Sequence, residues 1–208
     1  MITINIKDKT DDISILLVVS KYSQQVVKIY TNRKKKKTLN YRLFRAGVLG
    51  DILYKLGGKN VKNNEAENQV VAALTEYFIF NLRIIHDILL EVIGLSLNKK
   101  LPKSYNDLLK KIKSDDKSFP EIKGDLRKHI IRYSAGFEEL RRIRNSIKED
   151  EILNILVKNN IYYVNVKGFG NTKNVRILYE KKLSEMIFNY TSFLFILMLI
   201  ISQDTKSI

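Results

Sequence analysis

Three side chains that can bind or transfer charge stand close together within residues 137–149. Arg144 and Asn145 are adjacent, and Glu149 follows five residues after the arginine. An arginine offers a planar guanidinium that can hold a phosphate through two parallel hydrogen bonds. A glutamate can take up a proton as a general base. The alternative is structural, because an arginine near a helix end can pair with Glu149 or with a backbone carbonyl.

These side chains stand at the end of a long helix predicted over residues 120–148, with Pro120 in its first turn. Apolar residues recur along it at helical steps of three and four. This stripe comprises Ile122, Leu126, Ile130, Tyr133, Phe137, Leu140 and Ile147. The position missing before Ile147 is 143 or 144, so Arg144 is expected on or beside the buried face. Arg141 and Arg142 are expected in solvent or against phosphate.

The run from Leu140 to Asn145 resembles the signature of the HEPN superfamily (higher eukaryotes and prokaryotes nucleotide-binding). That signature lies late in a long helix and reads Arg, a polar residue that is often Asn, three variable residues and His. The segment around Asn81 to Val92 resembles the first long helix of such domains. The resemblance covers about residues 65–202. It implies a HEPN-like helical bundle that forms a homodimer and cleaves RNA without metal or cofactor.

One position departs from the signature, because the histidine would fall at position 149, where this chain has Glu149. In HEPN ribonucleases the arginine and histidine of two protomers meet at the dimer interface, and the 2′-hydroxyl of the RNA attacks its own phosphate. A carboxylate adds negative charge beside that phosphate, and it donates no proton unless its pKa is raised. We therefore expect an RNA-binding protein in which Arg144, Asn145 and Glu149 give weak or no catalysis. The setting that the resemblance implies is bacterial, in phage defence or a toxin–antitoxin pair.

Positive charge is concentrated in two blocks of the chain. The net charge is +15, of which residues 1–60 carry +9 and residues 99–148 carry +8, whereas residues 61–98 carry −3. Such blocks attract RNA through the release of counterions. They would also attract an acidic protein partner or an anionic membrane, and lysine enrichment in an AT-rich genome is a plainer origin. The expected RNA contacts are Lys34, Lys35, Lys36, Lys37, Arg141 and Arg142.

Composition excludes several classes of enzyme. The chain of 208 residues has no cysteine, which rules out a disulfide scaffold, a thiolate zinc site and a thiol nucleophile. Its two histidines, His86 and His129, leave little for a zinc site. It has neither a Gly-x-x-x-x-Gly-Lys-Ser phosphate loop nor a Gly-x-Ser-x-Gly nucleophile elbow. The first residues lack the apolar core of a signal peptide, so a cytoplasmic protein is expected.

The predicted fold is mainly helical, with a basic N-terminal extension over residues 1–60 and a HEPN-like domain over residues 61–208. In the extension we expect a strand over 2–6, a helix over 12–30, a solvated lysine loop over 33–37 and a helix over 39–56 that ends at Gly57 and Gly58. In the domain we expect a helix over 63–98 that Asn63 or Asn64 caps, with Val70 and Tyr77 on its apolar stripe. A capping box of Ser104 and Asp107 is expected to open a helix over 104–113. After the helix over 120–148 we expect a helical turn or two over 151–158, a β-hairpin over 161–179 with its turn at 168–171, and a last helix over 180–202.

Several residues carry both a structural and a functional interpretation. His86 and His129 are expected as buried structural histidines, with His86 as a possible replacement general acid. Tyr162, Tyr163 and Phe169 are expected to pack in the core, although aromatic rings also stack on bases. The apolar run over residues 187–201 is interrupted by polar residues, so it predicts a core helix without integral membrane association. A second hypothesis is a non-catalytic dimerisation and interaction module that docks an acidic protein.

Overall fold

A computed structural model describes residues 33–57, 63–114, 118–148, 153–169 and 176–204. The elements within these ranges are α2 (Arg33–Gly57), α3 (Glu65–Ser96), α4 (Tyr105–Ser114), α5 (Gly124–Arg132), α6 (Ser134–Lys148), β1 (Asn154–Lys158), β2 (Ile161–Phe169), β3 (Arg176–Lys182) and α7 (Leu183–Asp204). The prediction of a mainly helical protein is confirmed. The strand predicted over 2–6 and the helix predicted over 12–30 lie outside the described residues.

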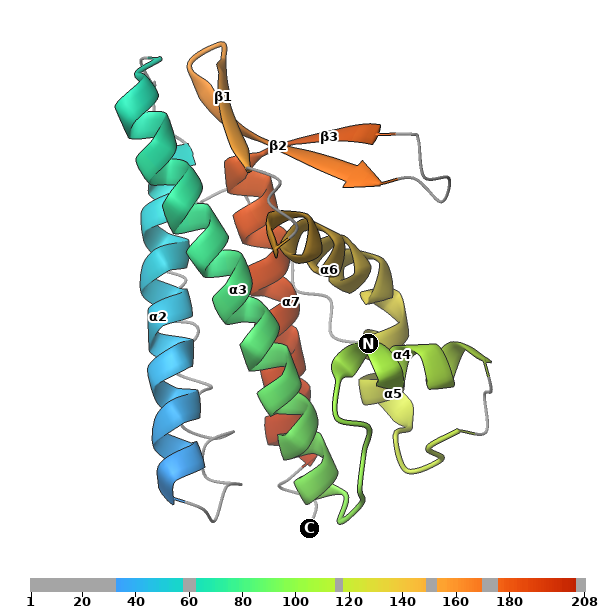
Figure 1. The fold of residues 1–208 in the computed structure, drawn as a ribbon. Helices are drawn as coiled ribbons and strands as arrows, with labels where there is room; N and C mark the ends of the chain where they lie inside the picture. Colours follow the sequence, from blue (N-terminus) through green and yellow to red (C-terminus); the bar gives the residue numbers. More distant parts are fainter. Residues whose placement is uncertain (1–32, 58–62, 115–117, 149–152, 170–175, 205–208) are drawn as a thin grey trace.

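The three longest helices, α2, α3 and α7, pack along one another, and the small sheet lies across one end of them (Figure 1). Helix α2 contributes Leu39, Leu43 and Leu53 to the same buried core as α3 and α7. The helix on one side of residue 60 and the helices on the other therefore share one core. Gly57 ends α2 as predicted, and a Cβ there would come within 3.0 Å of the Ser184 amide nitrogen of α7.

The lysine run over residues 33–37 does not form the predicted loop, because α2 begins at Arg33 and includes it. Lysine is a good helix former, and its long side chain reaches water from a helix surface. Lys34 and Lys37 are exposed, and Lys35 forms an ion pair with Glu91 of α3. The run is therefore solvated, as predicted, but on an ordered helix.

Asn64, one of the two residues predicted as the cap, caps α3. Its side-chain oxygen accepts hydrogen bonds from the backbone amides of Ala66 and Glu67 at 3.0 and 3.4 Å. The predicted buried stripe of this helix is partly wrong, since Val70 and Tyr77 are exposed. Val70 faces solvent, and Tyr77 lies under the Arg45 guanidinium of α2, which is 4.8 Å from its ring centroid.

Ser104 and Asp107 form the predicted capping box at the start of α4, with their side chains 2.7 Å apart. The single helix predicted over 120–148 is wrong. The chain becomes helical only at Gly124 and breaks at Tyr133, which separates α5 from α6 (Figure 1). The apolar periodicity continues through the break because both helices turn their apolar residues to the same core.

The region predicted as a helical turn over 151–158 is the strand β1. Asn159 and Asn160 have φ values of 50° and 60°, so they form the two-residue turn that joins β1 to β2. Such a turn suits the right-handed twist of paired strands, and it dictates an antiparallel hairpin rather than a helix. Within this hairpin Ile155 pairs with Val164, and both side chains are buried against the helices.

The predicted hairpin of β2 and β3 is confirmed as an antiparallel pair. The turn predicted at 168–171 begins later in the structure, because Gly168 and Phe169 still pair with Ile177 and Arg176. The residues between these strands lie outside the described part of the chain. The sheet thus has three strands in the order β1-β2-β3 rather than two.

Helix α7 supplies the centre of the core. Leu194, Leu197 and Met198 are fully buried. Among the described residues, one stretch, Leu183–Ile201, is long and apolar enough to cross a membrane, but half of it is buried inside the protein. That burial fits the predicted core helix.

Candidate functional site

Helix α6 carries the arginines that the sequence singles out. Arg144 is half-buried, and its Nη1 donates a hydrogen bond to Oδ1 of Asn145 at 3.2 Å. Its Nε is buried with no hydrogen-bond partner in the described structure. Arg142 is exposed, and Arg141 pairs with Glu138 at 2.9 Å. The adjacent motif residues Arg144 and Asn145 are therefore hydrogen-bonded to each other, and the Nε–H of the guanidinium is left without an acceptor in the described structure.

The third predicted catalytic residue, Glu149, lies outside the described residues. Its position relative to Arg144 therefore remains a prediction from the sequence. The structure brings together two of the three motif residues, on the last turns of α6.

The lysines of α2 are not near this motif. Arg33 begins α2 at the end of the molecule opposite the sheet, whereas the end of α6 lies close to the sheet (Figure 1). The expected RNA contacts thus fall on two separate basic surfaces. The α2 surface comprises Lys34, Lys35, Lys36 and Lys37, and the α6 surface comprises Arg141, Arg142 and Arg144.

The two histidines lie in a buried aromatic cluster. The His86 and His129 rings stack on Phe193 of α7, each with its ring centroid 5.1 Å from that of the phenylalanine. Phe137 and Tyr133 contact the same cluster from α6 and from the break between α5 and α6. The structural interpretation of both histidines as buried residues is confirmed.

Both imidazoles are neutral at pH 7. Burial away from water lowers the pKa of His86 to about 4 and that of His129 to about 4. Nδ1 of His86 lies 2.7 Å from the Leu82 carbonyl oxygen, so in the neutral ring Nδ1 carries the proton and donates it. Nε2 is then an acceptor, and it has no partner within the described structure.

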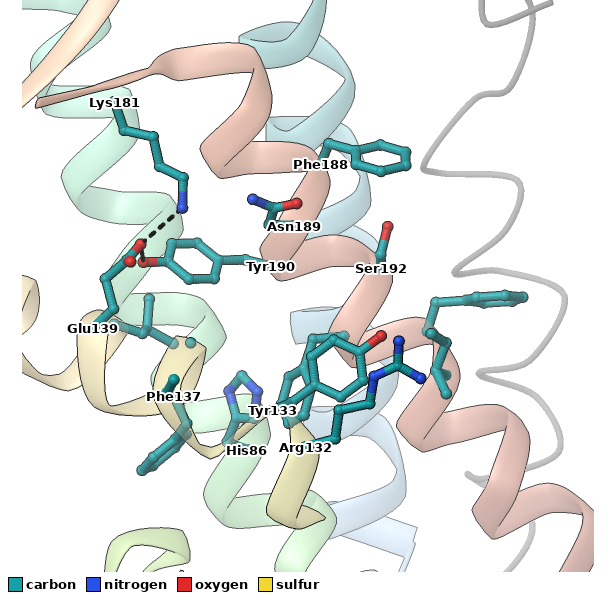
Figure 2. A pocket seen from close by; sticks show the side chains of 16 residues that line it. His86, Arg132, Tyr133, Phe137, Glu139, Lys181, Phe188, Asn189, Tyr190 and Ser192 are labelled. Carbon is teal, nitrogen blue, oxygen red and sulfur yellow. Dashed lines mark hydrogen bonds and ion pairs between the residues drawn. The ribbon is translucent and has the colours of Figure 1, made fainter. Parts of the chain in front are cut away.

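A groove of about 800 Å³ opens beside this cluster, between α7 and the helices α5 and α6. Figure 2 shows His86, Tyr133 and Phe137 grouped on one side of it. On another side Glu139 accepts hydrogen bonds from Lys181 at 3.3 Å and from the Tyr190 hydroxyl at 2.6 Å. Arg132 lies farther along the lining. The groove thus combines an aromatic surface with charged groups.

Sequence reasoning missed this groove. Its polar residues come from α3, α5, α6, β3 and α7, so no local spacing connects them. The one available signal was the ambiguity of His86, a histidine among apolar neighbours on a long helix.

The three aromatic residues of the hairpin, which were expected to pack in the core or to stack on bases, differ in burial. Tyr162 is fully buried, which confirms core packing. Tyr163 is half-buried, with the Lys158 ammonium 5.8 Å from its ring centroid. Phe169 pairs through its backbone in β2, and its side chain lies outside the described part.

In the described ranges, no three carboxylate or histidine side chains gather as metal ligands would. Comparison with models of known protein families, with curated proteins and with solved structures returns no match for this chain. The HEPN resemblance therefore rests on the residues of α3 and α6 alone.

Proposed function

We propose that this protein is a HEPN-like RNA-binding protein in which α6 contacts the RNA backbone and cleavage is weak or lost. The bacterial defence or toxin–antitoxin setting comes from the resemblance and is part of the proposal, as is the homodimer. Support comes from the mainly helical fold and from a motif that stands late in a helix packed on α3.

The observation that carries the proposal is the state of the Arg144 guanidinium. It is half-buried, it makes one hydrogen bond to Asn145, and its Nε has no partner in the described structure. A buried charge with unsatisfied donors is costly unless a counter-ion completes it. A phosphate oxygen is such a partner, and it matches the planar fork of an arginine. Arg142, exposed on the same helix, adds a second cation.

Cleavage is expected to be weak or lost because position 149 holds a glutamate where the HEPN signature has a histidine. A carboxylate about 4 Å from a phosphate near the protein surface is repelled by on the order of 4 kcal/mol. General acid–base help is typically worth about 10²–10⁴-fold in rate, and Glu149 supplies that help poorly. A histidine removes the repulsion and carries protons near pH 7.

The test is cleavage of labelled single-stranded RNA in EDTA by the wild type, Glu149→His, and Glu149→His combined with Arg144→Ala. We expect little cleavage by the wild type, a clear rise with Glu149→His, and loss of that rise without Arg144. Strong wild-type cleavage that survives Arg144→Ala would contradict the site. An inert Glu149→His variant that still dimerises would leave the motif structural.

A second candidate, the interaction module for an acidic protein, is favoured by the exposed apolar residues of α2 and α3. Lys35 pairs with Glu91, and the Arg45 guanidinium lies 4.8 Å from the Tyr77 ring centroid, so the two helices run antiparallel side by side. Large apolar side chains are exposed on them. These are Tyr41, Phe44 and Ile52 of α2 and Val70, Tyr77, Ile84 and Leu95 of α3.

Exposed apolar residues beside a lysine run fit an amphipathic helix with acidic flanks. This function predicts that Tyr41→Ser with Val70→Ser raises solubility and leaves RNA binding unchanged. Absence of RNA binding at any salt concentration, together with tight binding of an acidic amphipathic peptide that these changes abolish, would place this candidate first.

A further inference from the structure

One side of α7 is only partly buried, although it is largely apolar. The stretch Leu183–Ile201 is apolar enough to cross a membrane, yet only half of it is buried inside the protein. From Glu185 onward the less buried positions recur at helical steps. They are Glu185, Phe188, Asn189, Ser192, Phe195, Ile196, Leu199 and Ile200, and we call them the α7 stripe. Phe188 is 39% exposed. A stripe of this kind along one helix is the usual contact surface for another helix.

The α7 stripe forms one wall of the groove of about 800 Å³ that opens beside His86. Its members Phe188, Ser192 and Ile196 all line the groove. The other wall includes Ala135 and Gly136 of α6, and a Cβ on Gly136 would meet nothing within 4 Å in the described structure. The groove therefore has apolar side chains on one wall and open space at the other, which suits an apolar helix.

The direction of α2 fixes where the chain enters the bundle. A Cβ on Gly57, the last residue of α2, would lie 3.0 Å from the amide nitrogen of Ser184, which stands in the first turn of α7. Because α2 and α7 pack along each other, they run antiparallel, and Arg33 begins α2 at the end of the bundle where α7 finishes (Figure 1). A helix that precedes α2 and packs on the bundle therefore ends at that same end and runs parallel to α7.

Residues 15–30 carry an apolar stripe whose spacing matches the α7 stripe. They belong to the helix predicted over 12–30, which lies outside the described residues, so this stripe comes from the sequence. Its members are Ile15, Val18, Val19, Tyr22, Val26, Ile29 and Tyr30. The same steps separate Glu185, Phe188, Asn189, Ser192, Ile196, Leu199 and Ile200. Two parallel helices of about 24 Å would therefore bring the two stripes into register.

We propose that residues 15–30 of this chain form a helix that packs in the groove parallel to α7, with Tyr22 facing Ser192. Only residues 31 and 32 separate this segment from α2, and about two residues suffice to join antiparallel helices. The groove is then an internal interface that the N-terminal segment fills. This inference is independent of the proposed function.

Introduced cysteines test the contact directly, because the chain has no cysteine of its own. Tyr22→Cys with Ser192→Cys is expected to form a disulfide under mild oxidation. Gln24→Cys with Ser192→Cys is the matched control, since two residues turn a helix by about 200° and place Gln24 on the far side. We expect the first pair to close at least about tenfold faster than the control. Equal rates for the two pairs would overturn the proposal.

The concentration dependence of the same reaction identifies the occupant. Within one chain, closure proceeds at a rate that does not change with protein concentration and gives a product of monomer mass. A rate that rises with concentration, with a covalent dimer as the product, would mean that a second copy fills the groove, and the proposal would be wrong.

Hydrogen exchange in the wild type tests the docking without any substitution. The amides of residues 19–30 are expected to exchange at least about tenfold more slowly than amides of an unfolded chain, because helical hydrogen bonds protect them. Exchange at the unprotected rate would overturn the proposal.

Two charge variants then separate a docked helix from an isolated one. Tyr22→Asp puts a carboxylate into the apolar contact and is expected to abolish the protection and to raise binding of the apolar dye 1-anilinonaphthalene-8-sulfonate. Gln24→Asp adds the same charge on the far side and is expected to change neither. Protection that survives Tyr22→Asp, or equal effects of the two variants, would contradict docking in the groove.

Discussion

Arg144 donates a hydrogen bond from Nη1 to Oδ1 of its neighbour Asn145, across 3.2 Å in the partly buried last turns of α6. This contact fixes the two residues that carry the HEPN resemblance relative to each other. It uses one of the five guanidinium N–H donors, and Nε has no partner in the described structure. The proposed function rests on the guanidinium N–H groups that this contact leaves for a phosphate oxygen.

The lysine run at the start of α2 has opposite consequences for stability and for RNA binding. Positive charge in the first turn opposes the helix dipole, and α2 has no acidic residue there. Replacing Lys34, Lys36 and Lys37 by Gln keeps helix propensity. We expect the melting temperature to rise slightly while RNA affinity falls, with the salt slope flattened by about one unit for each lost phosphate contact. Unchanged affinity would remove α2 from the RNA surface.

The two buried histidines predict a stability that depends on pH. The pKa of each is lowered to about 4 in the folded protein, whereas an unfolded histidine titrates near pH 6.5. Between these values the unfolded chain binds more protons than the folded protein. Stability is therefore full above about pH 6.5 and falls toward pH 4, by on the order of 3 kcal/mol for each histidine.

Urea unfolding at a series of pH values measures this effect. The double variant His86→Phe with His129→Phe is expected to lose less stability over the window from pH 6.5 to pH 4 than the wild type. Equal pH dependence of the two proteins would mean that carboxylates, not these imidazoles, cause the loss of stability at low pH.

The turn between β1 and β2 predicts a specific ranking of substitutions. Asn160 has a φ of 60°, a conformation that costs a β-branched residue about 1–2 kcal/mol. Asn160→Val is expected to destabilise the protein by that amount in urea unfolding, and Asn160→Gly to leave it unchanged or slightly more stable. Equal stability of both variants would contradict the turn geometry.

The homodimer is expected to bring the ends of two α6 helices together near a two-fold axis. A second copy there could supply partners to the Arg144 guanidinium, which is half-buried. Light scattering at micromolar concentration is expected to give twice the mass of the 24.3 kDa chain. A monomer over the whole concentration range would count against the dimer.

The sequence predicted elements where local chemistry decides the structure. The cap at Asn64, the capping box at Ser104 and the end of α2 at Gly57 depend on residues a few positions apart. The prediction over residues 120–148 was wrong because an apolar stripe records which face is buried, not whether the helix axis continues. The break at Tyr133 separates two helices that both bury apolar residues in the same core.

The strand β1 was missed for a different reason. Its hairpin is set by the adjacent residues Asn159 and Asn160, whose positive φ values form the turn, and the helical prediction for residues 151–158 did not include this pair. The groove beside His86 has no such signal, because tertiary packing alone brings Arg132, Glu139 and Lys181 to the histidine. The α6 motif was predictable because its residues are neighbours in the chain.

The central claim is that this protein binds RNA through phosphate contacts that include the α6 arginines. The most direct measurement is the affinity of the wild type for labelled single-stranded RNA in EDTA at 50 and 200 mM salt, beside Arg142→Gln with Arg144→Gln and the control Lys113→Gln. The account predicts that the higher salt weakens wild-type binding by at least about tenfold, and that the double α6 variant weakens binding and flattens the slope more than the control does. Binding that is absent at both salt concentrations, or that neither salt nor the α6 changes affect, would contradict it.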